Sequence, residues 1–130
     1  MVTAKRVLVV EDSRLQAQLA ADILRKHGYL SDIALTPEET LQKLSNPVLP
    51  DLVLMDIDLG GKLDGAALAR TIQERHDIPI VFLTALSTKE IIEKARTVAR
   101  YGYILKGAPE HVIVSTVEMA LELHKALSSA

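Results

Sequence analysis

The stretch LVLMDID, residues 52–58, carries the pattern that decides the fold, because four consecutive apolar residues run directly into acidic ones. A second stretch, IVFLT at residues 80–84, likewise ends on a polar side chain. A strand that is apolar at consecutive rather than alternate positions is buried on both faces, as in a parallel sheet covered by helices on each side. The two stretches therefore predict strands of a parallel sheet.

Short apolar runs of this kind alternate with helical patterns along the chain. The predicted strands are Arg6–Val10, Asp32–Leu35, Leu52–Met55, Ile80–Leu83 and Tyr103–Leu105. Between and after them, five helices are predicted: one with Leu15, Leu19, Ile23 and Leu24 at helical spacing, one opening at Thr36-Pro37, one after Asp64-Gly65, one over Thr88–Arg100, and one from Pro109 almost to the C-terminus. This alternation predicts an α/β fold, a doubly wound five-stranded parallel sheet with helices on both faces.

Length and composition narrow the class of protein. A chain of 130 residues suits one domain, residues 1–130. The absence of cysteine excludes disulfides and a cysteine nucleophile, which fits a reducing compartment, and we expect a cytoplasmic protein. A net charge of −2 and four aromatic residues disfavour direct binding of nucleic acid. No apolar run is long enough to cross a bilayer, so no membrane contact is expected.

Polar side chains stand at the end of four of the five predicted strands. Glu11 and Asp12 follow the first, Asp56 and Asp58 the third, Thr84 ends the fourth, and Lys106 follows the fifth. The carboxyl ends of parallel strands meet at one rim of the sheet, where doubly wound folds bind their ligands. The sequence thus predicts a single site built from these residues.

The residue types at this rim indicate phosphoryl chemistry. Carboxylates brought together repel one another unless a cation neutralises them, and hard oxygen ligands suit Mg²⁺, which commonly binds one or two carboxylates and a phosphate. Thr84 can donate a hydrogen bond to a phosphoryl oxygen and Lys106 can neutralise its charge. One carboxylate then remains as a nucleophile that can form an aspartyl phosphate.

Five segments in this order resemble the response-regulator receiver family: VLVVEDS (7–13), LVLMDIDL (52–59), LDG (63–65), VFLTA (81–85) and GYILK (102–106). The resemblance covers essentially the whole chain and implies the flavodoxin-like receiver fold. It implies a signalling switch that takes a phosphoryl group from a sensor histidine kinase or a histidine phosphotransfer protein and slowly hydrolyses it. By residue, it makes Asp56 the phosphoacceptor, Glu11, Asp12, Asp56 and the Asp58 backbone carbonyl the Mg²⁺ ligands, Thr84 and Tyr103 the switch residues, and Lys106 the cation that pairs with phosphate.

Three positions depart from the family pattern or qualify it. Gly107 stands where the family usually has a proline after a cis peptide bond, and without proline the cis form is disfavoured. Residues 59–63 form a glycine-rich version of the loop after the phosphoacceptor strand. The resemblance implies that Asp58 and Leu86, two residues beyond Asp56 and Thr84, flank the approach of the attacking water. Leu86 cannot orient that water, so we expect slower hydrolysis of the aspartyl phosphate than in a Leu86→Glu variant.

Other functions remain open from the sequence. Asp56-Ile57-Asp58 also looks like the nucleophile motif of a haloacid-dehalogenase-like phosphatase, although that family needs later acids for its metal. A topoisomerase-primase type of nucleic-acid enzyme places its acids similarly but leaves Thr84 and Lys106 without a role. A metal-free scaffold of the same fold would bind no magnesium.

The predicted last helix carries two apolar stripes, one formed by Ile113, Val117 and Ala120 and one by Val112, Met119 and Leu123. The first stripe can cover the sheet. We expect the second, on the face formed by the fourth helix, fifth strand and fifth helix, to bind a downstream protein or a second copy of the chain. The alternative is that the fourth helix and loops bury it.

Overall fold

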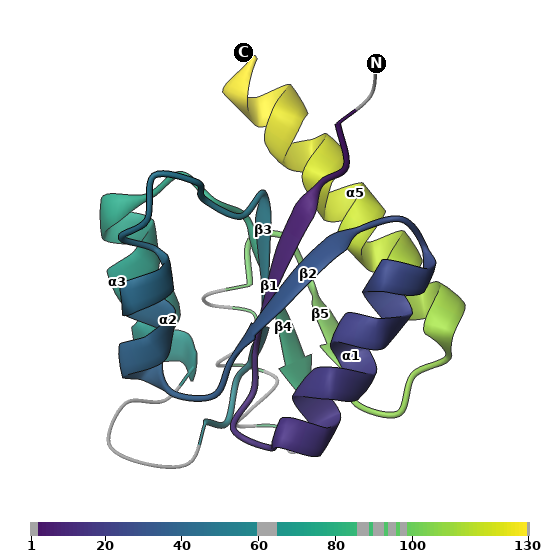
Figure 1. Ribbon diagram of the computed structural model, residues 1–130. Coiled ribbons are helices and arrows are strands. Elements are labelled where there is room, and N and C mark those ends of the chain that lie inside the picture. Colours follow the sequence, from purple (N-terminus) through teal and green to yellow (C-terminus); the bar gives the residue numbers. More distant parts are fainter. Residues whose placement is uncertain are drawn as a thin grey trace.

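The computed structural model describes residues 3–59, 65–85, 89, 93, 96 and 99–129, and its described part forms one parallel sheet between layers of helices (Figure 1). The strands are β1 (Arg6–Val10), β2 (Leu30–Ala34), β3 (Leu52–Asp56), β4 (Ile80–Thr84) and β5 (Tyr103–Leu105), in the spatial order β2-β1-β3-β4-β5. The helices are α1 (Arg14–Lys26), α2 (Pro37–Lys43), α3 (Gly65–Arg75) and α5 (Glu110–Ser128). The predicted α/β class and parallel pairing are confirmed.

Two apolar cores lie on opposite faces of the sheet. In β1, Val7 and Val9 pack into the core beneath α1 and α5, whereas Leu8 and Val10 pack into the core beneath α2 and α3. Every residue of β3 is buried, as its consecutive apolar pattern predicts. The two covered faces leave the ends of the strands as the places where polar groups can gather.

Strand boundaries shift in a way that matters for the site. β2 begins two residues before the predicted Asp32, and β3 and β4 each extend one residue further than predicted. Asp56 pairs with Leu83 in the ladder, and Thr84 pairs with Leu105. The backbones of Asp56 and Thr84 are thus fixed within the sheet rather than in the loops beyond it.

The buried faces of α1 and α5 differ in part from the faces that carry their large apolar residues. In α1 the buried positions are Ala17, Ala20, Ala21 and Leu24, whereas Leu15 is 70% exposed and Leu19 55% exposed. Small alanines let α1 lie close to the sheet. In α5 the buried positions are Val114, Val117 and Ala120, which confirms two members of the predicted first stripe, while Val114 takes the place of Ile113, which is half-buried.

Some predictions fall on residues outside the described ranges. Of the predicted fourth helix, Lys89, Glu93 and Arg96 are described and helical, whereas Ala99 and Arg100 are described and not helical, so the helix does not reach the predicted Arg100. Of the glycine-rich segment 59–63, Leu59 is described and buried, whereas residues 60–63 and Leu86 lie outside the described residues. Within the described part of the chain, no helix has both the length and the apolar character that crossing a bilayer requires.

Candidate functional site

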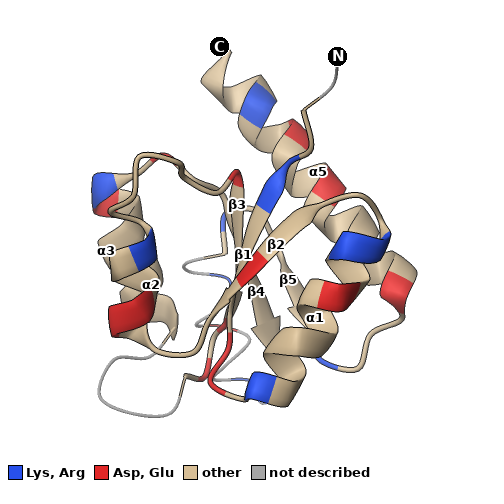
Figure 2. Ribbon diagram, viewed as in Figure 1, with Lys and Arg blue, Asp and Glu red and all other residues tan. Residues whose placement is uncertain are grey.

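The polar side chains singled out from the sequence come to one rim of the sheet. Acidic residues lie at the carboxyl ends of the central strands, below the strand labels in Figure 2. Glu11 and Asp12 come from the turn after β1, and Asp56 is the last residue of the adjacent strand β3. Thr84 ends β4, and Lys106 follows β5. The parallel topology therefore gathers residues that are up to 95 positions apart, from Glu11 to Lys106.

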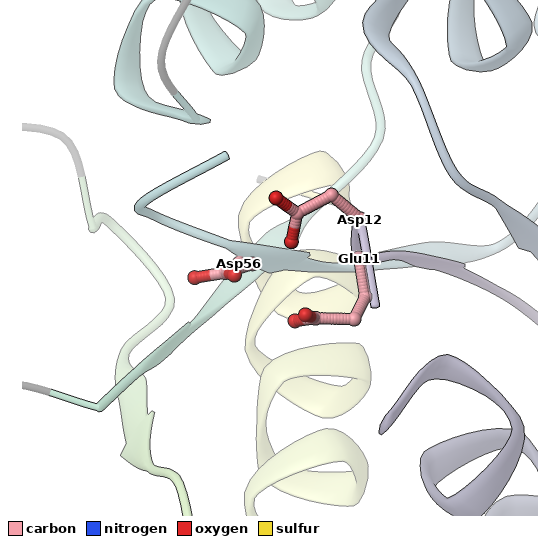
Figure 3. A group of neighbouring side chains, drawn as sticks. All are labelled: Glu11, Asp12 and Asp56. Atoms are coloured by element: carbon pink, nitrogen blue, oxygen red, sulfur yellow. The ribbon is translucent and has the colours of Figure 1, made fainter. Parts of the chain in front are cut away.

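Three carboxylates form a cluster at this rim. One oxygen from each of Glu11, Asp12 and Asp56 lies within 4.8 Å of the others, and Figure 3 shows the side chains extending from the ends of their two strands. Glu11 and Asp56 are only 2% and 3% exposed, whereas Asp12 is exposed. Two buried acids and one exposed acid therefore face a common volume.

Lys106 provides the positive charge. Its Nζ lies 2.9 Å from Asp56 Oδ2, to which it donates a hydrogen bond, and 2.9 Å from Glu11 Oε2. Its backbone N–H donates to the carbonyl of Thr84 at 2.8 Å, continuing the β4–β5 ladder. The lysine is therefore fixed at both ends, by the sheet and by the acids.

The charges perturb one another. Burial raises the pKa of the Glu11 carboxyl to about 7, the Lys106 ammonium acts to lower it, and the negative charge of Asp56 raises it further. Burial by itself lowers the pKa of Lys106, but the hydrogen bond to Asp56 and the negative charges of Asp56 and Glu11 outweigh it and leave this pKa raised. Lys106 thus stays protonated, and one ammonium does not fully compensate two buried acids.

The residues fit a hard divalent cation. Glu11 Oε2 is buried and, among the described residues, accepts no hydrogen bond, because its contact with Lys106 is an ion pair without hydrogen-bond geometry. A buried carboxylate oxygen without a hydrogen bond, beside two other carboxylates, is what a cation-binding site presents when its charge is not yet balanced. A donor set made only of carboxylate oxygens suits Mg²⁺.

Three further predicted residues take defined places. The N–H of Asp58 donates to Asp56 Oδ1 at 3.0 Å, while the Asp58 carboxylate is exposed and outside the cluster of three. Thr84 is 2% exposed at the rim. Tyr103 on β5 pairs with Phe82 on β4, which lies two residues before Thr84. Tyr103 is 40% exposed.

The turn after Lys106 follows the path that glycine permits. The N–H of Ala108 donates to the carbonyl of Leu105 at 3.1 Å, and Gly107 has a φ of +87°. Positive φ at the third position is typical of a type II turn and favours glycine. The described residues contain no cis peptide bond, so glycine replaces the family's usual proline with a trans turn.

Sequence reasoning missed one polar side chain at the rim. Gln16 Oε1 accepts a hydrogen bond from Lys106 Nζ at 2.9 Å. Gln16 lies in the first turn of α1, directly after the Glu11-Asp12 turn. The signal was available, because the helix after β1 must begin at the same rim as the acids.

Comparisons with known proteins agree with this geometry. Residues 7–118 match the model of the response regulator receiver domain. The chain is 29% identical to the transcriptional regulatory protein PdtaR of Mycobacterium tuberculosis over 96% of its own length and 60% of that protein, and 30% identical to the chemotaxis protein CheY of Treponema pallidum over 90% of its length and 83% of that protein. The chain thus spans less than two thirds of PdtaR.

A solved structure adds a close likeness in three dimensions. It is the N-terminal domain of a response regulator/sensory box/GGDEF three-domain protein from Carboxydothermus hydrogenoformans. The two share 48% sequence identity with a TM-score of 0.87, over 95% of this chain and 99% of that one. With the family match over residues 7–118, these findings show that the chain belongs to the response regulator receiver domain family of two-component signalling.

Proposed function

We propose that the whole 130-residue chain acts as one phosphorylation-dependent switch in the cytoplasm, with Asp56 as the residue that accepts the phosphoryl group. The observation that carries the proposal is the pairing of a buried Asp56 with Lys106 at 2.9 Å, next to the carboxylates of Glu11 and Asp12. Asp56 Oδ1 is oriented by the Asp58 N–H, so both oxygens of the acceptor have defined directions. A fixed carboxylate beside a fixed cation suits in-line attack on phosphorus.

The chemistry needs few protein groups. An Asp56 oxygen attacks phosphorus of a phosphohistidine, a P–O bond forms, the P–N bond breaks, and the imidazole leaves. Lys106 balances charge on the transferred phosphoryl oxygens, and the Thr84 hydroxyl donates a hydrogen bond to one of them. In hydrolysis, water attacks phosphorus and the bond to Asp56 breaks, releasing inorganic phosphate and restoring the carboxylate.

Glu11, Asp12, Asp56 and the Asp58 backbone carbonyl would hold Mg²⁺. When bound, the ion supplies positive charge that offsets the carboxylates and the incoming phosphoryl dianion. Without it, the acids at the rim repel an anionic donor.

The phosphodonor we propose is a sensor histidine kinase or a histidine phosphotransfer protein. Exposed Leu15 and Leu19 on α1 lie beside the rim and offer apolar surface to such a partner. Leu19 and Ile23 also line a shallow cavity of about 300 Å³ together with Leu105, Lys106 and Ile113. An apolar surface that adjoins the acceptor can dock a protein donor more readily than a small metabolite. The comparisons give no support to the phosphatase alternative.

A variant at the acceptor tests the proposal. With Mg²⁺ and a small phosphodonor, intact-mass measurement should show one added phosphate on the parent and none on Asp56→Asn. Asp22→Asn, which changes an exposed acid on α1, serves as the matched control and should be phosphorylated like the parent. A phosphate that persists on the Asp56→Asn chain would refute the assignment.

A further inference from the structure

Lys106 has a third oxygen neighbour besides the two acids. Asp56 Oδ2, Glu11 Oε2 and Gln16 Oε1 each lie 2.9 Å from its Nζ. The ammonium donates hydrogen bonds to Asp56 and to Gln16, and its contact with Glu11 is an ion pair. Two of the neighbours are carboxylates and the third is a neutral amide.

Gln16 is held in place by the turn that carries the acids. The Ser13 N–H donates to Glu11 Oε1 at 3.2 Å, and Ser13 Oγ accepts the Gln16 N–H at 3.3 Å as the cap of α1. Contacts therefore run from Glu11 through Ser13 and Gln16 to Lys106, and back to Glu11. This closed ring joins the turn after β1 to the turn after β5.

The Gln16 amide differs from the two acids because phosphorylation does not change its contacts. Asp56 becomes bonded to phosphorus, and Glu11 is placed to serve the cation, so each must change its relation to Lys106. A neutral amide oxygen attracts a divalent cation less strongly than a carboxylate does and takes no phosphoryl group. Gln16 can therefore keep its hydrogen bond to Lys106 while both acids change partners.

A fixed acceptor matters for Lys106 because the turn that follows it does little to restrain its conformation. Gly107 follows Lys106 with a φ of +87°, and a Cβ at Gly107 would meet nothing within 4 Å, so no packed side chain restrains that side of the turn. A flexible four-carbon side chain loses rotamer freedom when it is held in one geometry. A neutral acceptor that stays in place reduces this cost at the moment of phosphoryl transfer.

We propose that Gln16 is a positioning residue that keeps the Lys106 ammonium aimed at the phosphoryl site while Asp56 and Glu11 exchange partners. The inference rests on the proposed phosphoryl transfer to Asp56 and adds a residue to it. Gln16 acts through Lys106 and does not bind the metal ion.

The test compares Gln16→Met, which keeps length but removes the acceptor, with Gln18→Met as its control. Gln18 lies on the same helix, is exposed, and donates its side-chain amide to Asp22 instead. With saturating Mg²⁺, Gln16→Met should lower the maximal rate of phosphorylation by a small donor about threefold to tenfold, as expected for the loss of one hydrogen bond. The Mg²⁺ dissociation constant should stay within about twofold of the parent. Gln18→Met should match the parent in both.

A spectroscopic measurement separates this inference from the proposed function. In ¹⁵N-lysine NMR, the parent should show a Lys106 ammonium signal whose protons exchange slowly with water. This exchange should be faster in Gln16→Met and slow again in Gln16→Glu, which keeps an acceptor. If the parent takes no phosphate, the proposed function fails and the NMR comparison alone decides whether Gln16 holds Lys106. An unchanged ammonium signal in Gln16→Met, or an unchanged maximal rate in a parent that is phosphorylated, overturns the inference.

Discussion

Gly65 shows at the scale of one residue how closely α3 approaches the phosphoacceptor strand. A Cβ at this position would collide with the carbonyl oxygen of Asp56 and would lie 2.7 Å from Ile57 Cα and 2.9 Å from the Ile57 carbonyl oxygen. The Gly65 N–H also donates to that Ile57 carbonyl at 3.0 Å. Only a residue without a side chain allows this contact between the start of a helix and the end of a strand.

Gly65→Ala should therefore lower stability and disturb the acceptor together. We expect a loss of about 1–3 kcal/mol in the free energy of unfolding, the usual cost of overpacking, because backbone rather than a flexible side chain must move. Urea unfolding measures the stability, and intact-mass measurement of the phosphorylated fraction reports on Asp56. A variant as stable as the parent would show that the helix and strand can separate freely.

Asp12 is the exposed member of the carboxylate cluster, and its variant tests the metal site directly. Asp12→Ala should weaken Mg²⁺ binding by at least about tenfold, since even residues outside the ligand set often cost that much. Calorimetric titration measures the affinity, and the phosphorylation rate should fall with it. Asp51→Ala, which removes an acid at the opposite end of β3, is the control for charge alone. Equal Mg²⁺ affinity in parent and Asp12→Ala would contradict the proposed ligands.

At the scale of elements, the turn between β5 and α5 depends on a single positive φ. Gly107→Ala meets no atom within 4 Å, so its cost is backbone strain alone. We expect it to lower the free energy of unfolding by about 1–2 kcal/mol, the range for a side chain in the left-handed region. Thermal or urea unfolding checks this value. No loss of stability would mean that the turn can adopt another shape.

An ion pair links β2 to α2 and gives a pH-dependent contribution. Lys43 Nζ lies 3.0 Å from Asp32 Oδ2. Burial raises the pKa of Asp32, but the hydrogen bond from Lys43, the Ile33 N–H and nearby positive charges outweigh it and hold this pKa below its ordinary value of 3.8. A lowered pKa in the folded state means that the pair stabilises the fold above pH 3.8 and stops doing so as the pH falls through the lower value.

Lys43→Met should therefore lose stability at pH 7 and lose progressively less below pH 3.8. The Asp32 side chain is 69% exposed, so solvent screening keeps the difference below about 1 kcal/mol. Urea midpoints of parent and variant, measured from neutral to acid pH, give the difference. In an Asp32→Asn background this pH dependence should shrink, and what remains comes from Glu39, whose Oε1 lies 3.5 Å from Lys43 Nζ. A difference that grows toward acid pH would have the wrong sign for this pair.

At the scale of the whole molecule, α5 presents apolar surface that the sheet does not use. Val114, Val117 and Ala120 cover the core, while Met119 is 68% exposed and Leu123 is 44% exposed. Val112, the third member of the predicted second stripe, is half-buried. We propose that this surface, with β5 and the predicted fourth helix, binds a downstream protein or a second copy once Asp56 is phosphorylated, through the switch residues Thr84 and Tyr103.

A double variant tests the self-association branch of this proposal. With a phosphate mimic, light scattering should show a higher mass for the parent and monomer mass for Met119→Glu/Leu123→Glu, because two charges would have to be buried in the interface. Val48→Glu, which alters an apolar side chain that is 64% exposed and lies in the loop before β3, should behave like the parent. If the mass never changes and partner binding survives the double variant, the output surface lies elsewhere.

The sequence by itself determined the strands, their parallel pairing and the polar residues at their ends. Those features are local: consecutive apolar residues in LVLM and IVFL need two covered faces, and a residue that follows a strand must reach the rim where that strand ends. Glu11, Asp56 and Lys106 could therefore be assigned to one site before their distances were known. The altered turn at Gly107 could also be predicted from the sequence, since glycine adopts dihedral angles that proline cannot.

The tertiary structure decided which face of each helix is buried and which side chains complete the site. In α1, the leucines Leu15 and Leu19 stay exposed and the alanines pack, because the space between helix and sheet, not hydrophobicity alone, selects the face. The contact of Gln16 with Lys106 joins residues 90 positions apart. Such a pair depends on where two separate turns come to lie, and that position is fixed only when the sheet brings β1 and β5 to the same rim.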